Sequence, residues 1–293
     1  MKKLNITFFG TPEFSVKILE KLKKEGFMPS LVVTTPDKPQ GRKLVLTSPP
    51  TKIWAKENGI NVLQPTKLKD EEFLNKLKET EWDLFIVASY GKIIPQAVLD
   101  IPKHETINVH PSLLPRLRGA SPMQSAILTE DKTGMTIMLM DAGMDHGPIL
   151  MQKELDIPNW PPKISELENM LAEIGGEMLT ETIPLWVDGK ITPQEQNHDE
   201  ATYIDKIEKE EAVIDLNDNP EKNYRKIQAL QNYKPHFFIK KNNTPNSTSK
   251  NGQRKIRVII KDAKLEAGEF IITRVLPEGK KEMDYQDFLR GNK

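Results

Sequence analysis

The sequence predicts an α/β protein with a doubly wound, mostly parallel sheet, followed by a smaller β-rich domain. Up to about residue 185, short apolar runs alternate with segments of helical periodicity. That alternation is typical of a parallel sheet covered by helices on both faces. After residue 205 the pattern changes to β-rich runs joined by short turns, which favours a small barrel or sandwich. A length of 293 residues also exceeds the usual size of one domain.

The expected elements of the first domain follow one another in strand–helix order. Strands are expected at 4–9, 30–35, 60–64, 83–89, 106–110 and 133–140, and helices at 12–24, 51–59, 70–80 and 164–187. The run DLFIVAS at 83–89 is almost continuously apolar, as a strand buried on both faces requires. The polar segment 189–205 is typical of a linker. We therefore expect domains at 1–188 and 206–293, the second with strands at 254–261 and 268–277.

The charge is balanced overall but unevenly distributed. The chain has 42 Lys and Arg against 42 Asp and Glu, yet residues 222–264 hold twelve cations and one acid, Asp262. A basic patch favours a polyanionic partner, and a solvated basic loop is the alternative. The chain has no cysteine, which excludes disulfides and thiolate catalysis. No apolar run approaches the roughly 20 residues of a membrane span, so we expect a cytoplasmic protein without a membrane partner.

The sequence after the first strand argues against a nucleotide ligand. FFGTPEF at 8–14 keeps one glycine of a dinucleotide fingerprint, and Pro12 and Glu13 stand where the backbone would have to approach a pyrophosphate. A phosphate-binding loop with the pattern G-x-x-x-x-G-K-[ST] does not occur in the sequence either. The predicted sheet is therefore expected to hold another kind of ligand.

Candidate catalytic residues lie at two predicted strand ends. Asn108 and His110 are two residues apart at the end of TINVH, so their side chains leave the same face of that strand. Asp141 and Asp145 follow the next strand, among glycines. An amide, an imidazole and a carboxylate together can stabilise an oxyanion and move protons during acyl transfer to an amine. The alternative is structural, because a histidine at a strand end and an Asp before a glycine are also common turn features. No metal-ligand spacing appears.

Five stretches give the sequence a resemblance to a known family. These are FFGTPEFS (8–15), TTPDKPQGRK (34–43), VASYGKIIP (87–95), INVHPSLLPRLRGASP (107–122) and DAGMDHGPIL (141–150). In this order and spacing they resemble methionyl-tRNA formyltransferases, over nearly the whole chain. The fourth and fifth stretches are shared with all folate-dependent formyltransferases, so they indicate the chemistry more closely than the acceptor.

The resemblance implies transfer of a formyl group from 10-formyltetrahydrofolate to the α-amine of methionine on initiator tRNA, without a metal. It implies a Rossmann-like catalytic domain, an OB-like β-barrel that binds tRNA, and a catalytic trio of Asn108, His110 and Asp145. The residues implied for folate binding are Lys92, Ile93, Ile94, Ser112, Leu113, Leu114, Pro115 and Asp141. Those implied for tRNA binding are Lys38, Arg42 and Lys43, in the loop 36–48. We expect a monomer.

Two other functions stay open on the sequence. A small-molecule formyltransferase, acting on an amino sugar or glycinamide ribonucleotide, shares the catalytic stretches but has no need of a basic second domain. A non-catalytic folate- or RNA-binding module is the other alternative. Arg116 and Arg118, in the turn after His110, are expected near the tRNA or in domain packing and not in the chemistry.

Overall fold

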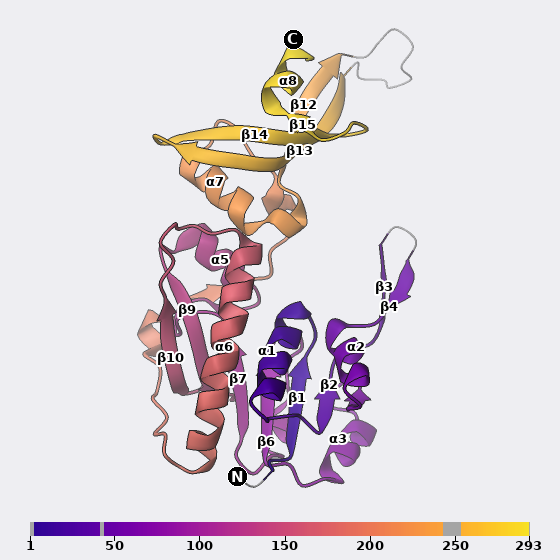
Figure 1. The fold of residues 1–293 in the computed structure, drawn as a ribbon, viewed down its shortest axis with the longest axis vertical. Helices are drawn as coiled ribbons and strands as arrows, with labels where there is room; N and C mark the ends of the chain where they lie inside the picture. Colours follow the sequence, from indigo (N-terminus) through magenta and orange to yellow (C-terminus); the bar gives the residue numbers. More distant parts are fainter. Residues whose placement is uncertain (1–2, 42–43, 243–252, 293) are drawn as a thin grey trace. The chain divides into compact units, whose positions relative to one another are not determined.

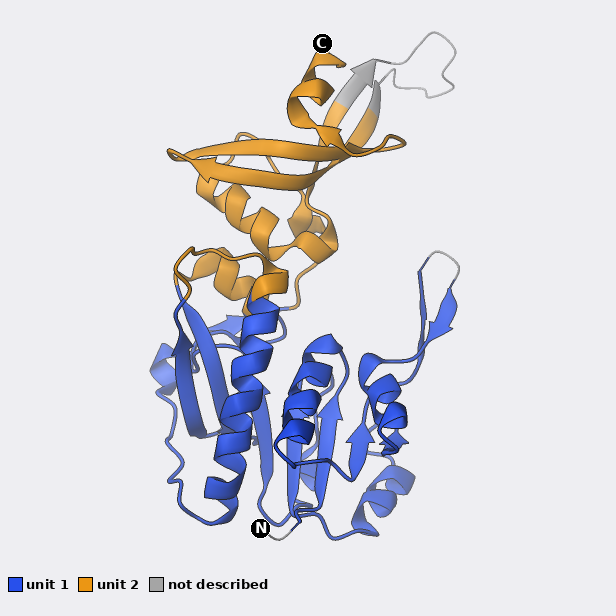
Figure 2. Cartoon of the chain, viewed as in Figure 1, with its two compact units in different colours: residues 1–122, 132–156, 167–205 blue, residues 123–131, 157–166, 206–293 orange. Residues whose placement is uncertain are grey.

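The structure, a computed structural model, describes residues 3–41, 44–242 and 253–292, without the side chains of 240–242 and 253–254. It contains two compact units, coloured separately in Figure 2. Unit 1 comprises residues 1–122, 132–156 and 167–205, and unit 2 comprises residues 123–131, 157–166 and 206–293. Across the described residues, no helix is both long and apolar enough to cross a membrane.

Unit 1 contains a seven-stranded sheet in the order β10-β9-β7-β6-β1-β2-β5 (Figure 1). Its strands are β1 (Ile6–Gly10), β2 (Leu31–Val33), β5 (Asn61–Leu63), β6 (Leu84–Ala88), β7 (Thr106–His110), β9 (Thr133–Leu139) and β10 (Ile149–Leu155). The strands from β5 to β7 in this order are parallel, and β9 and β10 join antiparallel at one edge. The predicted α/β class with a mostly parallel sheet is therefore confirmed.

Helices cover both faces of this sheet. They are α1 (Glu13–Lys24), α2 (Pro50–Glu57), α3 (Glu71–Lys78), α4 (Gln96–Leu99) and α6 (Ile164–Val187). A further helix, α5 (Pro122–Thr129), belongs to unit 2 from Met123 onward. One face of the sheet forms an apolar cluster with α3 and α4. On the other face α6 packs closely because Gly175 lacks a Cβ, which would lie 3.0 Å from Met135 Cε and 3.1 Å from Val109 Cγ1. Figure 1 shows α1 and α6 side by side on this second face.

Local sequence accounts for the bounds of α1. Pro12 precedes the first turn, and the apolar side chains that recur at helical spacing are buried, namely Phe14, Ile18, Leu19 and Leu22. Glu13 lies in the first turn and lysines lie in the last, as the helix dipole favours. The helix ends before Gly26, whose φ of 85° suits a residue without a Cβ. The next strand, β2, then pairs in parallel with β1.

The chain order places a switch point beside β1. From β1 the chain adds β2 and β5 on one side and returns to add β6 and β7 on the other. The carboxyl ends of β1 and β6 align, since Gly10 pairs with Ala88, and Asn108 of β7 pairs with Val87. Ligands of open α/β sheets bind beyond this edge. Asn108 and His110 therefore lie where such a site is expected.

Two small sheets accompany the large one. The hairpin of β3 (Lys38–Gln40) and β4 (Val45–Thr47) follows β2, and β8 (Arg118–Gly119) pairs in parallel with β11 (Tyr203–Ile204). The segment 189–205, predicted to be a linker, contains β11 and the short 3-10 helix His198–Glu200, and belongs to unit 1.

Unit 2 is built around an antiparallel sheet in the order β12-β13-β14-β15. Its elements are 3-10 helices Lys209–Ala212 and Gln231–Tyr233, α7 (Pro220–Ala229), β12 (His236–Asn242), β13 (Gln253–Glu266), β14 (Glu269–Pro277), β15 (Met283–Asp284) and α8 (Tyr285–Arg290). Ile227 of α7 and Phe288 of α8 join the apolar core of this sheet, with Val258 and Val275. The antiparallel sheet agrees with the predicted small β domain.

Candidate active site

Asn108 and His110 lie at the carboxyl end of β7 in the middle of the sheet. Only 8% of Asn108 and 4% of His110 is exposed. The strand ends at His110 because Pro111 has no N–H to continue the ladder, and Ser112 N–H turns back to the His110 carbonyl. Both predicted side chains are therefore held in a buried and well-defined position.

One ring nitrogen of His110 is committed to the protein. Nε2 lies 3.1 Å from the carbonyl oxygen of Leu117, a residue whose backbone has an unusual φ of 60°. A carbonyl can only accept, so Nε2 carries a proton. The other nitrogen, Nδ1, lies 3.6 Å from Oδ1 of Asp145. Nδ1 is therefore the atom of this ring that faces the carboxylate and is left for a ligand.

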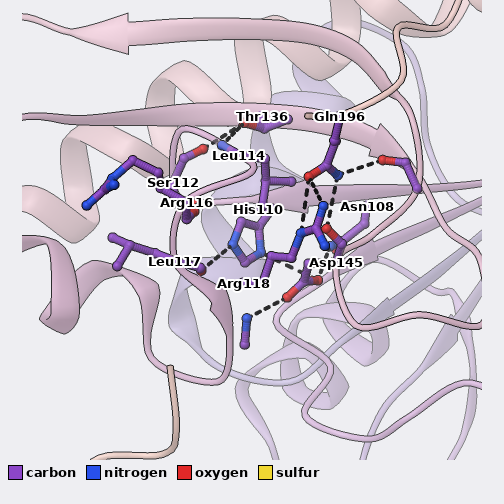
Figure 3. Close-up of polar contacts among 12 residues, drawn as sticks. Asn108, His110, Ser112, Leu114, Arg116, Leu117, Arg118, Thr136, Asp145 and Gln196 are labelled. Atoms are coloured by element: carbon purple, nitrogen blue, oxygen red, sulfur yellow. Dashed lines mark hydrogen bonds and ion pairs between the residues drawn. The ribbon is translucent and has the colours of Figure 1, made fainter. Parts of the chain in front are cut away.

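Asp145 reaches the two β7 side chains from the loop between β9 and β10 (Figure 3). Its Oδ1 lies 3.5 Å from Asn108 Nδ2, at the outer limit of a hydrogen bond, as well as near His110. Its Oδ2 accepts a 2.8 Å hydrogen bond from the backbone N–H of Gly119. The backbone of Asp145 has a φ of 48°, which non-glycine residues seldom adopt. The structure thus brings the predicted trio together.

The turn after His110 is fixed to the sheet. Ser112 Oγ donates to the Arg116 carbonyl at 2.7 Å, and its own carbonyl accepts from Thr136 Oγ1 of β9 at 2.7 Å. The same Thr136 oxygen accepts from the N–H of Leu114 at 3.3 Å. Ser112 and Leu114 are buried, whereas Leu113 and Pro115 are half-buried. This turn is therefore a rigid wall beside the trio.

Of the predicted folate-binding residues after β6, one is exposed and two are held within the protein. Ile93 is 87% exposed at the carboxyl edge of the sheet, whereas Ile94 is buried in the apolar cluster below. Lys92 Nζ donates to the backbone carbonyls of Pro65 and Thr66 at 2.8 and 2.9 Å. Lys92 therefore ties two loops together, and Ile93 is the side chain of this group that presents apolar surface.

Asp141 is engaged within its own loop. Its Oδ1 accepts from the N–H of Gly143 at 2.8 Å, and its Oδ2 lies 2.7 Å from His146 Nδ1. These bonds shape the loop that carries Asp145. In the described part of the chain, no group of three or more His, Asp or Glu residues is placed to bind a metal ion.

Of the predicted tRNA-binding residues, the structure describes only Lys38. It is exposed on β3, and Arg42 and Lys43 lie outside the described residues. The hairpin also exposes three large apolar side chains, those of Leu44, Val45 and Leu46, by 72%, 60% and 65%.

The base of the hairpin is anchored by Asp37. Hydrogen bonds from Gln64 and Lys52, both at 2.8 Å or less, lower the pKa of its carboxyl to about 2. Ser48 Oγ donates to the same carboxylate at 3.2 Å. The anchor ties the residues before β3 to the residues after β4 and to α2.

The burial of Arg118 agrees with one of its two expected places, that of a residue in domain packing. Arg118 is fully buried inside unit 1 and hydrogen-bonds to Gln196, which in turn binds the backbone of the Asp145 loop. The sequence pattern missed Gln196 because it lies in a polar segment typical of a linker. The Gly119 N–H and the Leu117 carbonyl were missed because every residue except proline carries the same backbone groups, so the sequence does not show which of them contact the site.

The geometry suits acyl transfer to an amine. Asn108 supplies an amide N–H donor, and His110 supplies a second donor when Nδ1 is protonated. Two donors directed at one place are what an oxyanion needs, and a carboxylate beside them can take a proton from an attacking amine. The trio requires no nucleophilic side chain if the acceptor itself is the nucleophile.

Comparison with known proteins identifies the family. The sequence profile described as Formyl transferase matches residues 2–183. The methionyl-tRNA formyltransferase of Bacillus licheniformis is 38% identical over 305 residues, covering 98% of this chain and 94% of the relative. That of a Geobacillus species is 39% identical over 301 residues, with 98% and 94% covered. The chain belongs to the methionyl-tRNA formyltransferase family.

Solved structures share the fold of this family member at low sequence identity. A methionyl-tRNA formyltransferase from Clostridium thermocellum has a TM-score of 0.59 and 21% identity, covering 96% of this chain and 99% of its own. An N-formyltransferase from Helicobacter canadensis, solved with folinic acid and dTDP-3-aminofucose, has a TM-score of 0.61 and 19% identity, covering 87% and 95%. Fold similarity alone therefore extends across formyltransferases with different acceptors.

Proposed function

We propose that this protein transfers a formyl group from 10-formyltetrahydrofolate to the α-amine of methionyl initiator tRNA, giving formylmethionyl-tRNA for translation initiation. The observation that carries the proposal is the convergence of Asn108, His110 and Asp145 at the sheet edge in a member of this family. The folate, when bound, supplies an activated formyl group.

The proposed roles of the trio follow from the side-chain atoms that can face the substrates. Asn108 Nδ2 and a protonated Nδ1 of His110 donate to the oxygen of the formyl group as the methionine amine attacks its carbon. Asp145 stabilises the imidazolium and accepts the proton that the amine loses. The new N–C bond forms as the bond from the formyl carbon to the folate nitrogen breaks, and that nitrogen is protonated. The hydrogen bond of Nε2 to the Leu117 carbonyl keeps the ring in place.

The folate contacts are proposed on one side of the trio. The exposed Ile93 offers an apolar surface to a flat ring, with the buried Ile94 supporting it from beneath. The turn Ser112–Pro115 supplies the facing wall, and because Ser112 Oγ is already bonded, that turn contacts the ligand through its backbone and through Leu113. Lys92 and Asp141 hold the flanking loops rather than present free side chains.

The tRNA contacts are proposed on the hairpin of β3 and β4 and on the second domain. The loop 36–48, with Lys38, Arg42 and Lys43, would contact the acceptor end. We propose that residues 1–188 form the catalytic domain, 189–205 a connecting segment and 206–293 an OB-like tRNA-binding domain. The cation excess of 222–264 supports this, although Arg225 is engaged with Asp131 and with the backbone carbonyls of Ile127 and Glu130. We propose a cytoplasmic monomer.

An acceptor-dependence assay tests the proposal. Purified protein is incubated with 10-formyltetrahydrofolate and methionyl initiator tRNA, and formylmethionyl-tRNA is measured together with consumption of the folate. Asn108→Ala and His110→Ala should each lower kcat on the order of a hundredfold or more, because each removes one oxyanion donor. Lys153→Ala, an exposed residue of β10, is the control that should keep full activity.

Three outcomes of that assay separate the candidate functions. Formylation of methionyl-tRNA by the wild type, lost in the Asn108 and His110 variants, supports the proposal. Folate consumption with an amino-sugar nucleotide or glycinamide ribonucleotide instead of tRNA would reassign the protein to small-molecule formyl transfer. Folate or tRNA binding without turnover would indicate a non-catalytic module.

A further inference from the structure

The segment 194–204 is bonded to both loops that shape the proposed active site. Gln194 exchanges two backbone hydrogen bonds with Ile149, next to the Asp145 loop. Thr202 Oγ1 accepts from the N–H of Leu117 at 2.8 Å, and the Thr202 carbonyl accepts from the N–H of Arg118 at 2.9 Å. Residues far apart in sequence from the trio therefore hold its surroundings.

Gln196 is the residue of this segment that reaches the Asp145 loop. It is 5% exposed, and its Nε2 donates to the carbonyls of Asp145 at 3.0 Å and Gly147 at 2.7 Å. Its Oε1 accepts from Arg118 Nε at 3.2 Å and from Nη2 at 2.7 Å. Because the Arg118 guanidinium can only donate, the amide oxygen must face it, and the two N–H groups must face the loop. The orientation of the amide is therefore fixed by Arg118.

Arg118 is an unusual residue to bury for packing alone. It is completely buried, and its other hydrogen bonds go to Tyr203 Oη at 3.0 Å and His198 Nδ1 at 2.9 Å. With the Gln196 oxygen, these acceptors are neutral, since a nitrogen that accepts from arginine carries no proton. Burying a guanidinium among neutral acceptors is costly unless every N–H is well used. Here the Arg118 guanidinium donates two hydrogen bonds to the Gln196 oxygen and so orients the amide.

The position of Asp145 depends on these contacts. Its φ of 48° is unfavourable for a residue with a Cβ and needs support from its surroundings. Oδ1 lies 3.5 Å from Asn108 Nδ2 and 3.6 Å from His110 Nδ1, so a small shift of the loop would separate the carboxylate from both. Gly119 N–H holds the side chain, and Gln196 holds the backbone of the same residue.

We propose that Gln196, oriented by Arg118, is a positioning residue that sets the Asp145 carboxylate against His110 and Asn108 during formyl transfer. The inference rests on the proposed function and adds to it a residue outside the five stretches shared with the family. Gln196 acts through Asp145 and does not itself touch the substrates.

A single substitution can keep the contact of Gln196 with Arg118 while it removes the hydrogen bonds of Gln196 to the Asp145 loop. Gln196→Glu keeps an oxygen for Arg118 and replaces the two donors to the Asp145 loop with an acceptor that faces two carbonyls. It should lower kcat by up to roughly a hundredfold, the scale expected when a catalytic group is displaced by about 1 Å. The KM values for 10-formyltetrahydrofolate and methionyl-tRNA should stay within about twofold, because ground-state binding is untouched. The neighbouring exposed Glu195→Gln is the control, and it should match the wild type.

A double-mutant cycle distinguishes positioning from a general loss of structure. If Gln196 acts through Asp145, Gln196→Glu should lower kcat little further in an Asp145→Asn background, whereas independent effects would multiply. Circular dichroism and thermal unfolding verify that each variant is folded, and Gln196→Met replaces Gln196→Glu, under the same criteria, if the latter does not fold.

Each outcome decides the inference. A fall in kcat with unchanged KM, absent in the Asp145→Asn background, supports it. An active wild type with an equally active Gln196→Glu variant, a change in KM alone, or multiplying effects would overturn it while leaving the proposed function intact. A wild type that is inactive on methionyl-tRNA would refute the proposed function itself, and this inference with it.

Discussion

Nε2 of His110 lies 3.1 Å from the carbonyl oxygen of Leu117, so the ring is held by one nitrogen and offers the other. The neutral ring should therefore carry its proton on Nε2. Nitrogen-15 NMR of histidine-labelled protein at high pH should show one ring in the Nε2–H form that disappears in His110→Asn. An Nδ1–H form for that ring would contradict the hydrogen bond from Nε2 to the Leu117 carbonyl.

Gly119 should not tolerate a side chain. Its φ is 125°, and an added Cβ would lie 2.1 Å from the carbonyl oxygen of Ile204 in the paired strand β11. Gly119→Ala should lower the free energy of unfolding by roughly 3 kcal/mol or more, because strain and a backbone clash add together. It should also lower kcat, since the Gly119 N–H holds Asp145.

Gly26→Ala is the matched control for that substitution. Gly26 has a φ of 85° with no other atoms within 4 Å of an added Cβ, so only backbone strain is introduced. The expected cost is about 1–2 kcal/mol with unchanged kcat. Urea unfolding and steady-state kinetics measure both variants, and equal stability losses would show that the contact with Ile204 is not a constraint.

The anchor at Asp37 predicts a defined pH dependence. Hydrogen bonds from Gln64 and Lys52 lower its pKa from 3.8 to about 2 in the folded protein. A lowered folded pKa means that the stabilisation is fully present above the unfolded value and is lost as pH falls from about 4 to about 2. The difference in unfolding free energy between the wild type and Asp37→Asn should be constant above pH 5 and shrink toward pH 2. A difference that grows in acid would contradict the anchor.

The apolar tip of the hairpin should matter for the acceptor and not for stability. Leu46 is 65% exposed, so Leu46→Gln removes little buried surface and should change the thermal unfolding temperature very little. If the hairpin contacts tRNA, its KM should rise severalfold, with the KM for 10-formyltetrahydrofolate unaffected. Ile53→Gln, at a 47% exposed residue of α2, is the control. An unchanged KM for tRNA in Leu46→Gln would remove the hairpin from the proposed interface.

The basic strand β13 should give tRNA binding a steep salt dependence. Lys255 and Lys261 are exposed on this strand. If each neutralises a phosphate, replacing either with alanine should reduce the slope of log affinity against log salt concentration by about 1. Filter binding over a range of salt concentrations measures the slope, with Lys153→Ala on β10 as a control of equal charge change. Slopes that do not differ from the wild type would count against a tRNA contact at β13.

Strong periodicity made the centre of unit 1 predictable from sequence. The expected strand at 106–110 and helix at 164–187 have the bounds that the structure gives β7 and α6. Buried parallel strands are apolar throughout, and long helices repeat their pattern over many turns. The edge strand β10 was missed because residues 152–154 are exposed and polar, so its sequence resembles a loop.

The sequence predicted which side chains meet at the candidate site, but it did not predict the residues that hold them in place. Asn108 and His110 share a strand, so spacing alone places them on one face. Their partners Gly119, Leu117 and Gln196 come from turns and from the segment 189–205, where position depends on tertiary contacts. Three-dimensional packing brings Gln196 to Asp145, and the secondary-structure propensity of a segment does not predict a contact between residues this far apart in the sequence.

The pairing of β8 with β11 has a consequence for how the protein is made and dissected. During synthesis the strand ends with Asn108, His110 and Asp145 emerge before the segment that holds them, so the catalytic arrangement is completed only when residues 194–204 have left the ribosome. The same order sets a limit for fragment design: the family profile ends at residue 183, but a catalytic fragment cut there lacks Gln196 and Thr202. A fragment meant to preserve the site must extend past Ile204, the last residue of β11.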